Sequence, residues 1–276
     1  MKYVELMPGI RSSAIGFGCA PVMGAVSGNK AKIAIDAAID AGVNHFDLAR
    51  SYGYGDAEQF VGKLTKGRRE QIVLASKFGI AVSGKAKLFR PLKPLIRLMN
   101  TKSKEHAASA TPVAEHSLAR FHFRVPANPE EMKKNLEISL RALKTDYLDY
   151  YFIHEPPVRL ANIEELIAFS RELKKQGKIR AFGLACWRDQ FSLHSDYLDR
   201  FDVLQFDLSP GAPGYEQTIR DRTSQSNIIF SPLKGGKKEL TAGQKLSALK
   251  NDLPKSVILC SMFNLQHLAT NTAIFK

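Results

Sequence analysis

Four ionisable residues of this chain have the types and positions that proton-transfer chemistry needs. Each ends, or lies just after, a short apolar run that is typical of a strand. They are Asp47, Tyr52, Lys77 and His154. A single residue of these types is usually structural or solvent-facing, but packing alone does not explain apolar strands that repeatedly end in an ionisable side chain. These four are therefore the candidate catalytic residues.

A tyrosine, a lysine and a carboxylate together predict a proton donor. Tyrosine has a pKa of about 10 and is a poor acid at neutral pH. Because a nearby ammonium favours the ionised form, Lys77 is predicted to lower the pKa of Tyr52. Asp47 would keep Lys77 charged and in place, and His154 would hydrogen-bond and orient a carbonyl oxygen. None of these groups supplies a hydride, so reduction of a carbonyl requires a cofactor.

Short apolar runs and longer amphipathic runs alternate along the chain and predict the elements that hold these residues. The expected strands are Ala14–Gly18, Asn44–Asp47, Ile72–Ser76, Tyr147–Ile153, Ile179–Leu184, Val203–Phe206, Ile228–Ser231 and Ser256–Cys260. The expected helices are Lys30–Ala41, Ala57–Leu64, Pro129–Leu143, Ile163–Gln176, Gln190–Leu198, Tyr215–Gln225 and Ala242–Asn251. Alternating strands and helices indicate a parallel sheet, and eight such units indicate a closed (β/α)8 TIM barrel.

The closed barrel would bring the four candidates together, because the carboxyl ends of its strands share one face. An open, doubly wound sheet is the structural alternative. It usually has a GxGxxG turn after the first strand, whereas here that strand ends in Gly16-Phe17-Gly18-Cys19, without the third glycine. The pattern therefore favours the barrel.

Two features depart from a minimal barrel within the single predicted domain, residues 1–276. Residues 80–128, after the third strand, form a long basic insertion of the kind that is usually functional or mobile, and we expect it to act as a lid. After Leu268-Ala269-Thr270-Asn271 only five residues remain, so the eighth helix is expected to be short.

The formal charge of +13 is concentrated in this insertion. Between Ile80 and Val125 nine basic and two acidic residues contribute +7. The interleaved Phe121, His122 and Phe123 are compatible with nucleic-acid binding, but a solvated lid explains them as well and is preferred. Nucleic acid is therefore not an expected partner.

Composition predicts a cytoplasmic protein without a membrane span or a metal. The longest apolar runs fall short of a transmembrane helix, and the first residues lack the apolar stretch of a signal peptide. Cys19, Cys186 and Cys260 are too widely spaced for a disulfide framework or a metal knuckle. The oligomeric state is not predicted.

The motifs around the candidates resemble those of the aldo-keto reductase superfamily. The segment 42–49 with Tyr52, Gly53, Gly55 and Glu58 is similar to the family's first signature, with Leu48 where threonine is usual. Ala75-Ser76-Lys77, and the run from Tyr147 to His154, resemble the next two blocks. The resemblance covers most of the chain outside the insertion. It implies that Asp47, Tyr52, Lys77 and His154 are the catalytic residues.

The resemblance also implies a site for NADPH, with NADH as the alternative. The implied cofactor-binding residues are Gln205 for the nicotinamide carboxamide, Phe230 for ring stacking, Ser231 and Leu233 for the pyrophosphate, and Ser261, His267 and Asn271 for the adenosine end. The family's Ser-Asn pair after the fifth strand is here Ala185-Cys186, and its usual basic contacts near the end of the chain are absent. These departures weaken the expectation of tight NADPH binding.

Several neighbouring residues have two interpretations. His45 is expected to be structural and to face away from Asp47, and Glu155 is expected to be a loop residue rather than a partner of the site. Cys186 is expected to be a small apolar filler rather than a redox group. Trp187 either lines the substrate pocket or caps the barrel.

Three functions follow from these observations. The leading one is an NAD(P)H-dependent oxidoreductase that reduces a small aldehyde or ketone, with the proton from Tyr52. The second is a cofactor-binding regulatory or partner subunit with little turnover, because fold does not determine function. The third is anion binding by the segment Lys85–Arg124, which high salt would weaken. The sequence does not identify the carbonyl substrate.

Overall fold

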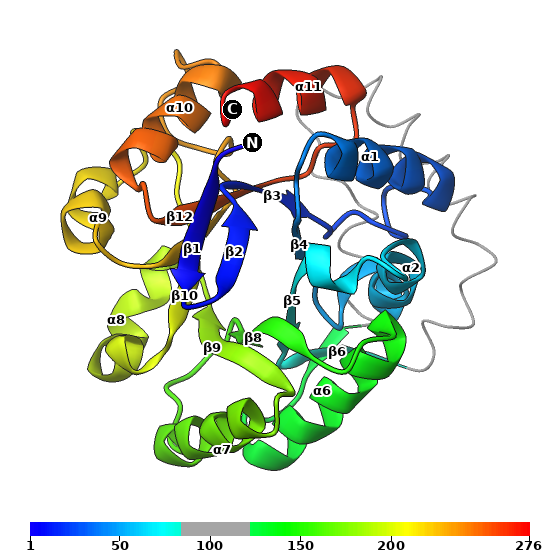
Figure 1. The fold of residues 1–276 in the computed structure, drawn as a ribbon. Coiled ribbons are helices and arrows are strands. Elements are labelled where there is room, and N and C mark those ends of the chain that lie inside the picture. The colour runs from blue at the N-terminus through cyan, green and yellow to red at the C-terminus, as the bar shows by residue number, and fades with distance from the viewer. Residues whose placement is uncertain (84–121) are drawn as a thin grey trace.

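A closed barrel of eight parallel strands forms the centre of the computed structural model, which describes residues 1–83 and 122–276 (Figure 1). In order around the barrel the strands are β3 (Ile15–Gly18), β4 (His45–Asp47), β5 (Val73–Phe78), β8 (Leu148–His154), β9 (Ile179–Ala185), β10 (Val203–Asp207), β11 (Asn227–Phe230) and β12 (Ser256–Cys260). Parallel pairing of β12 with β3, in which Ile258 lies opposite Ile15, closes the ring. The predicted (β/α)8 barrel is confirmed.

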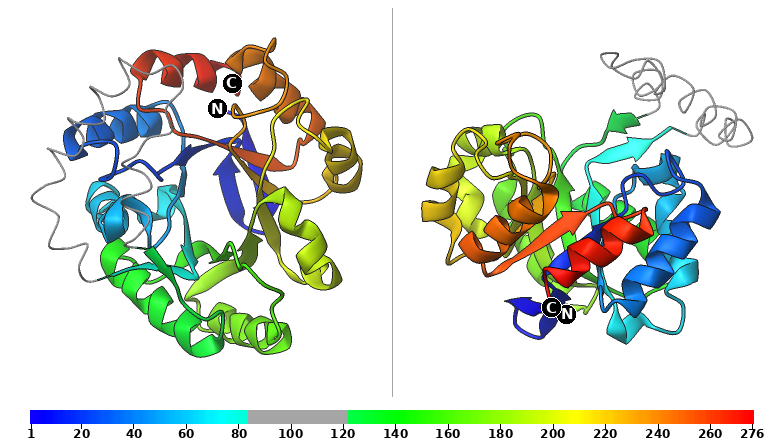
Figure 2. Two further views of the ribbon diagram at one scale, coloured as in Figure 1. Left: turned by 180° about the vertical axis from the view of Figure 1, so that it is seen from behind. Right: turned by 90° about the horizontal axis from the view of Figure 1, so that it is seen from above.

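In the described part of the chain, one α-helix lies between each pair of successive barrel strands and one follows the last strand, and these helices surround the barrel on the outside (Figures 1 and 2). They are α1 (Gly28–Asp40), α2 (Ala57–Leu64), α6 (Pro129–Leu143), α7 (Ile163–Lys175), α8 (Phe191–His194), α9 (Tyr215–Arg222), α10 (Ala242–Asp252) and α11 (Leu265–Ala273). Asn128 caps α6 by accepting from the Glu131 backbone N–H at 2.9 Å, and Pro129 follows as the first helical residue. The last helix, α11, is nine residues long, as expected.

The helix expected at residues 190–198 is wrong in its extent. The structure has only the four-residue α8 there, between the short 3-10 helices η4 (Arg188–Gln190) and η5 (Ser195–Arg200). The Ser195 hydroxyl bonds both the Ser192 carbonyl and the Asp196 carboxylate, at 3.2 Å each. Such local side-chain bonds compete with a regular helix, which explains the break.

An N-terminal hairpin that the sequence reading missed lies at the end of the barrel opposite the carboxyl ends of the strands (Figure 2). It consists of β1 (Tyr3–Met7) and β2 (Ile10–Ser13), which pair antiparallel across Pro8-Gly9. The apolar–charged–apolar pattern Val4-Glu5-Leu6 before the Pro8-Gly9 turn is the signal that could have revealed it, and both apolar residues are buried on β1. Both chain ends lie here, since the Lys2 backbone N–H donates to the Phe275 carbonyl.

A second hairpin forms the base of the predicted insertion. Its strands are β6 (Ile80–Val82) and β7 (His122–Arg124), which pair antiparallel. Residues 84–121 of the insertion, which include Phe121 and most of its basic residues, lie outside the described residues. The described helices include none that is long and apolar enough to cross a membrane.

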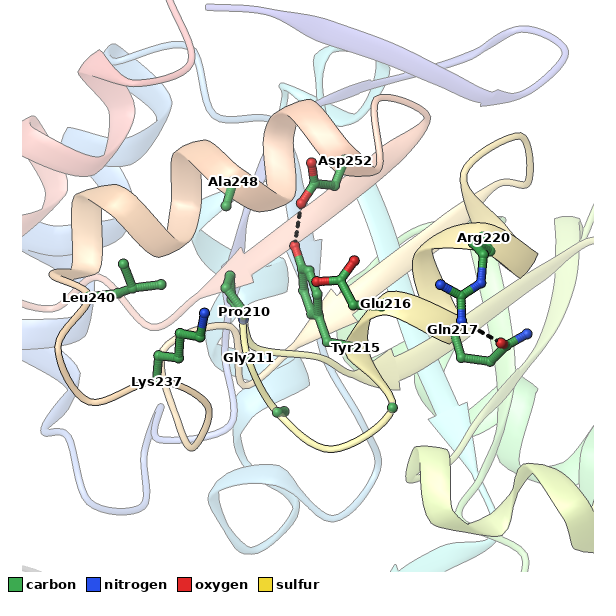
Figure 3. A pocket seen from close by; sticks show the side chains of 12 residues that line it. Pro210, Gly211, Tyr215, Glu216, Gln217, Arg220, Lys237, Leu240, Ala248 and Asp252 are labelled. Atoms are coloured by element: carbon green, nitrogen blue, oxygen red, sulfur yellow. Dashed lines mark hydrogen bonds between the residues drawn. The ribbon is translucent and has the colours of Figure 1, made fainter.

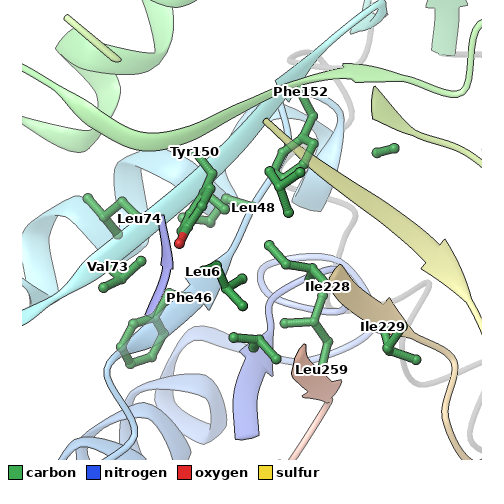
Figure 4. Packing of buried hydrophobic residues seen from close by; sticks show 14 of the residues in the cluster. Leu6, Phe46, Leu48, Val73, Leu74, Tyr150, Phe152, Ile228, Ile229 and Leu259 are labelled. Carbon is green, nitrogen blue, oxygen red and sulfur yellow. The ribbon is translucent and has the colours of Figure 1, made fainter. Parts of the chain in front are cut away.

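Large side chains fill the barrel (Figure 4). The stacked rings of Tyr150 and Phe152 have centroids 6.3 Å apart. Gly183 on the neighbouring strand allows this packing, because a Cβ there would lie 2.4 Å from the Phe152 ring and 2.5 Å from the Val203 carbonyl. Every residue of β8 is buried, as expected for a parallel strand that is covered on both faces.

Candidate active site

The carboxyl ends of four barrel strands bring ionisable and polar side chains to one end of the barrel interior. Asp47 and His154 are the last residues of β4 and β8, and Lys77 and Gln205 lie near the ends of β5 and β10. All four are at least nine-tenths buried. The arrangement predicted from the strand ends is therefore present in the fold.

The Lys77 ammonium is the centre of the cluster. Its Nζ lies 2.8 and 2.7 Å from the two carboxylate oxygens of Asp47, 2.8 Å from the Leu48 carbonyl and 3.2 Å from the Tyr52 hydroxyl. Lys77 is 2% exposed, so Asp47 is its essential counter-charge. Because Leu48 takes part through its backbone, the loss of the usual threonine leaves this contact intact.

A tight turn places Tyr52 over the lysine. Tyr52 begins the 3-10 helix η1 (Tyr52–Gly55), in which Gly53 has φ 59°. A Cβ on Gly53 would lie 2.4 Å from the Val22 carbonyl, so only glycine fits there. Glu58, which is buried in α2, accepts from Arg50 and from the Ser76 hydroxyl and thereby holds this loop against β5.

Burial raises the pKa of Tyr52 well above its usual value, and the carboxylates of Asp47 and Glu155 raise it further. The prediction that Lys77 lowers this pKa is wrong. The physical reason is that the buried phenol loses the water that would stabilise a phenolate and the Asp47 carboxylate repels a phenolate, and together these effects outweigh the contact with the Lys77 ammonium. Tyr52 is consequently a neutral phenol at physiological pH, the form that can give up a proton.

His154 faces Tyr52, with their rings edge to face and the centroids 6.1 Å apart. Burial lowers the pKa of His154 well below its usual value, and the positive charges of Lys77 and Arg124 lower it further. The imidazole is therefore neutral and carries one N–H donor. Its Nδ1 atom is buried without a hydrogen-bond partner among the described residues.

His45 is structural, as expected, but it does not face away from Asp47. Residues two apart on a strand share a face, so His45 lies below Asp47 in the barrel. Its Nδ1 lies 3.1 Å from the Ser12 hydroxyl, and its ring centroid is 5.6 Å from that of Tyr150. Burial, with a contribution from Lys77, lowers the pKa of His45 to about 3.

Glu155 takes part in the wall of the site, contrary to the expectation of a simple loop residue. Its carboxylate lies 4.0 Å from the Arg124 guanidinium and accepts a hydrogen bond from Trp187. Trp187 in turn packs edge to face on Phe230, with the ring centroids 5.0 Å apart. The position of Glu155 directly after a strand-end histidine was the signal in the sequence.

The predicted nicotinamide-binding residues lie beside the catalytic cluster. Gln205 donates from Nε2 to Asp47 Oδ1 at 2.8 Å, and its Oε1 is buried without a partner among the described residues. An unpaired buried acceptor suits an amide N–H of a ligand, so the residues present fit a nicotinamide carboxamide. Cys186 is buried, and burial raises its pKa to about 12, which supports the filler interpretation.

The remaining predicted cofactor residues follow β11 and β12, two neighbouring strands. Ser231 has φ 51° at the start of the loop after β11, and Leu233 is exposed further along it. After β12, the Ser261 hydroxyl donates to the Gly18 carbonyl at 3.0 Å. His267 is exposed in the first turn of α11, whereas Asn271 is buried later in that helix.

The groove of about 520 Å³ between α9 and α10 is separate from this cluster (Figure 3). Tyr215 lines it and donates to the Asp252 carboxylate at 2.6 Å, and none of the candidate catalytic residues reaches it. In the part of the chain that the structure describes, no group of three or more acidic, histidine or cysteine side chains could hold a metal ion.

The motifs and the barrel agree with a match to a known family. The aldo/keto reductase family matches residues 14–236 of the chain. This chain belongs to the aldo/keto reductase family. The match includes the four candidate catalytic residues and ends at Gly236, within the loop after β11.

Individual aldo/keto reductases are similar in sequence to part of this chain. It is 33% identical over 192 residues to the aldo-keto reductase YhdN of Bacillus subtilis, an alignment that covers 67% of this chain and 47% of that protein. It is 31% identical over 220 residues to the NADH-specific methylglyoxal reductase of Escherichia coli, with 74% and 58% covered. The chain thus spans about half the length of the curated relatives it matches.

The fold of the chain is also similar to that of solved aldo-keto reductase structures. An aldo-keto reductase from Klebsiella pneumoniae, solved in complex with NADPH, superposes with a TM-score of 0.67 at 19% identity, covering 99% of this chain and 89% of that one. At this identity the likeness establishes the common barrel, and the chemistry has to be argued from the residues themselves.

Proposed function

We propose that this aldo/keto reductase reduces an aldehyde or ketone to an alcohol with NAD(P)H, and that Tyr52 supplies the proton. The observation that carries the proposal is the Lys77 ammonium, which contacts both Asp47 carboxylate oxygens and the Tyr52 hydroxyl at once. The His154 ring beside Tyr52 adds a neutral donor for the carbonyl oxygen.

The cofactor and the residues of the site have different roles in the reduction of the carbonyl group. The bound nicotinamide supplies the hydride to the carbonyl carbon. The carbonyl oxygen lies between His154, which donates a hydrogen bond, and Tyr52, which transfers its proton to that oxygen. The phenolate that Tyr52 leaves behind is stabilised by the Lys77 ammonium, whose charge Asp47 maintains. Solvent returns the proton to Tyr52.

NADPH is the proposed cofactor, with NADH as the alternative. Gln205 would hold the carboxamide and Phe230 would stack on the ring, while Ser231 and Leu233 would contact the pyrophosphate. Residues 261–271, including Ser261, His267 and Asn271, contain no lysine or arginine for an adenosine phosphate. The names of the similar proteins support both choices, since one relative is NADH-specific and one structure holds NADPH.

Nicotinamide oxidation with a panel of small aldehydes tests the proposal. Tyr52→Phe should lower kcat by about 10²–10⁴-fold, the usual contribution of a general acid, with little change in cofactor affinity. Tyr54→Phe is the matched control, because Tyr54 lies two residues away and stacks on His122 instead. Equal turnover by Tyr52→Phe and wild-type protein would refute the role of Tyr52.

A cofactor-binding subunit with little turnover is the second candidate. It is favoured by Ala185 and Cys186, which are buried where the family has polar carboxamide contacts. A reduced nicotinamide dinucleotide that binds tightly while no aldehyde or ketone is reduced would support it. In that case Ala185→Ser with Cys186→Asn should increase turnover.

A further inference from the structure

A buried lysine on α10 has no acidic partner among the residues that the structure describes. Lys245 is 6% exposed, and the ion pairs of the described residues include no carboxylate within reach of it. Lys77, the other deeply buried lysine among the described residues, forms an ion pair with Asp47. Burying a charge without a counter-charge costs free energy. An anion bound near Lys245 would reduce that cost.

The Lys245 ammonium contacts the loop after β11. Its Nζ donates to the Gly235 carbonyl at 2.6 Å and to the Leu233 carbonyl at 3.4 Å. Ser209 also donates to the Gly235 carbonyl, at 3.2 Å. These bonds turn the carbonyl oxygens of Leu233 and Gly235 toward the Lys245 ammonium.

The loop depends on this support because its backbone is unusual. Ser231, Gly235 and Gly236 have φ values of 51°, 78° and 67°, in the left-handed region. The loop also packs against Pro210, whose carbonyl accepts from the Lys237 backbone N–H at 3.0 Å. Figure 3 shows Lys237 and Leu240 beyond this turn, beside the groove between α9 and α10.

We propose that Lys245 is a positioning residue for a nucleotide diphosphate held by this loop. It fixes the course of the loop at Leu233 and Gly235 and places a positive charge beside the loop. An incoming diphosphate provides the counter-charge that no described residue supplies. This inference rests on the proposed function, in which Ser231 and Leu233 contact the pyrophosphate of the cofactor.

Lys245→Gln tests the charge while keeping a hydrogen-bond donor for the loop carbonyls. The matched control is Lys250→Gln, since Lys250 lies on the same helix and also donates to a backbone carbonyl, that of Ile274, but away from the loop. Dissociation constants for inorganic pyrophosphate, NADPH and NADH would be measured by calorimetry. We expect Lys245→Gln to weaken the binding of pyrophosphate and of the cofactor about tenfold or more, and Lys250→Gln less than twofold.

The kinetic readout separates positioning from catalysis. Lys245→Gln should raise the KM for the cofactor but leave kcat at saturating cofactor within about twofold, and Lys245→Arg should restore most of the affinity. Unchanged dissociation constants in folded Lys245→Gln would overturn the proposal. If that variant does not fold, the dissociation constant of wild-type protein for pyrophosphate is measured at several salt concentrations. A dissociation constant that is independent of salt would overturn the electrostatic role of Lys245.

The two proposals can fail separately. If pyrophosphate and dinucleotide binding depend on Lys245 while no carbonyl is reduced, the reductase fails and the role of Lys245 stands. If turnover depends on Tyr52 while Lys245→Gln binds cofactor normally, the role of Lys245 is overturned. A wild-type protein that binds neither pyrophosphate nor a dinucleotide would overturn both.

Discussion

Asp47 joins the two halves of the candidate site. Both of its carboxylate oxygens bond Lys77, and Oδ1 also accepts from Gln205 across the barrel. One side chain therefore connects the residues proposed for proton transfer with a residue proposed for the nicotinamide. The ion pair between Asp47 and Lys77 explains why the cluster is buried without an unpaired charge.

His45 makes the folded protein sensitive to acid. Its pKa is about 3 when folded and 6.5 when unfolded, so between these values the unfolded chain binds a proton that the folded chain does not. Lower pH then favours unfolding, and the contribution of His45 to stability falls by about 3 kcal/mol between pH 6.5 and 4.

Urea unfolding of wild-type protein and His45→Asn at several pH values measures this contribution. The free energy of unfolding should depend less steeply on pH between 4 and 6.5 in the variant. His154 and His194, whose pKa values burial also lowers, remain in both proteins as a common background. Identical pH dependence in the two proteins would show that His45 is not the group responsible.

At the scale of elements, a buried carboxylate ties three strands together at the amino end of the barrel. Asp149 on β8 accepts from the Leu74 backbone N–H of β5 at 2.9 Å, from Arg69 at 2.8 Å and from Arg180 of β9 at 3.0 Å. Arg69 also bonds the Ile72 and Tyr147 carbonyls. The network fixes the register from which Lys77 and His154 reach the opposite end.

Asp149→Asn should destabilise the fold by about 3 kcal/mol, because removal of one partner leaves buried donors and a positive charge unpaired. The value lies at the low end of the usual range, since both arginines reach solvent. Turnover per folded molecule should stay near wild type. Asp36→Asn is the control, because its exposed ion pair with Lys32 is worth less than about 1 kcal/mol. Equal loss of stability in both variants would contradict the network.

At the scale of the molecule, the site is assembled from the whole barrel. Its residues come from strands between β3 and β12, and the ring closes only where the last strand pairs with the first. A ligand that contacts both β4 and β11 should therefore stabilise the whole fold rather than one segment of it.

Thermal unfolding with and without cofactor checks this expectation. At a concentration of about 100 times its Kd, NADPH or NADH should add about 2.7 kcal/mol of stability. For a chain of this size that corresponds to a rise in Tm of about 5 °C in a single transition. Adenosine, which lacks the diphosphate and the nicotinamide, should give almost none. A Tm unchanged by both dinucleotides would contradict the proposed site.

The sequence by itself determined the strand pattern and the cluster at the strand ends. Eight apolar runs separated by amphipathic ones admit few folds, and in a closed barrel their last residues share one face. Asp47, Lys77 and His154 could therefore be chosen as neighbours before any distance was known. These features are readable because they depend on local periodicity and on the order of elements along the chain.

Only the tertiary structure decided the charge state of Tyr52, the contacts of Glu155 and the partners of Lys245. Each depends on burial and on groups from distant parts of the chain: Asp47 and Glu155 act on Tyr52, and Leu233 and Gly235 meet Lys245. The sequence placed Lys77 near Tyr52 but could not weigh that ammonium against Asp47 and the loss of water. Electrostatic energies sum over all neighbours in space, and the fold is what brings those neighbours together.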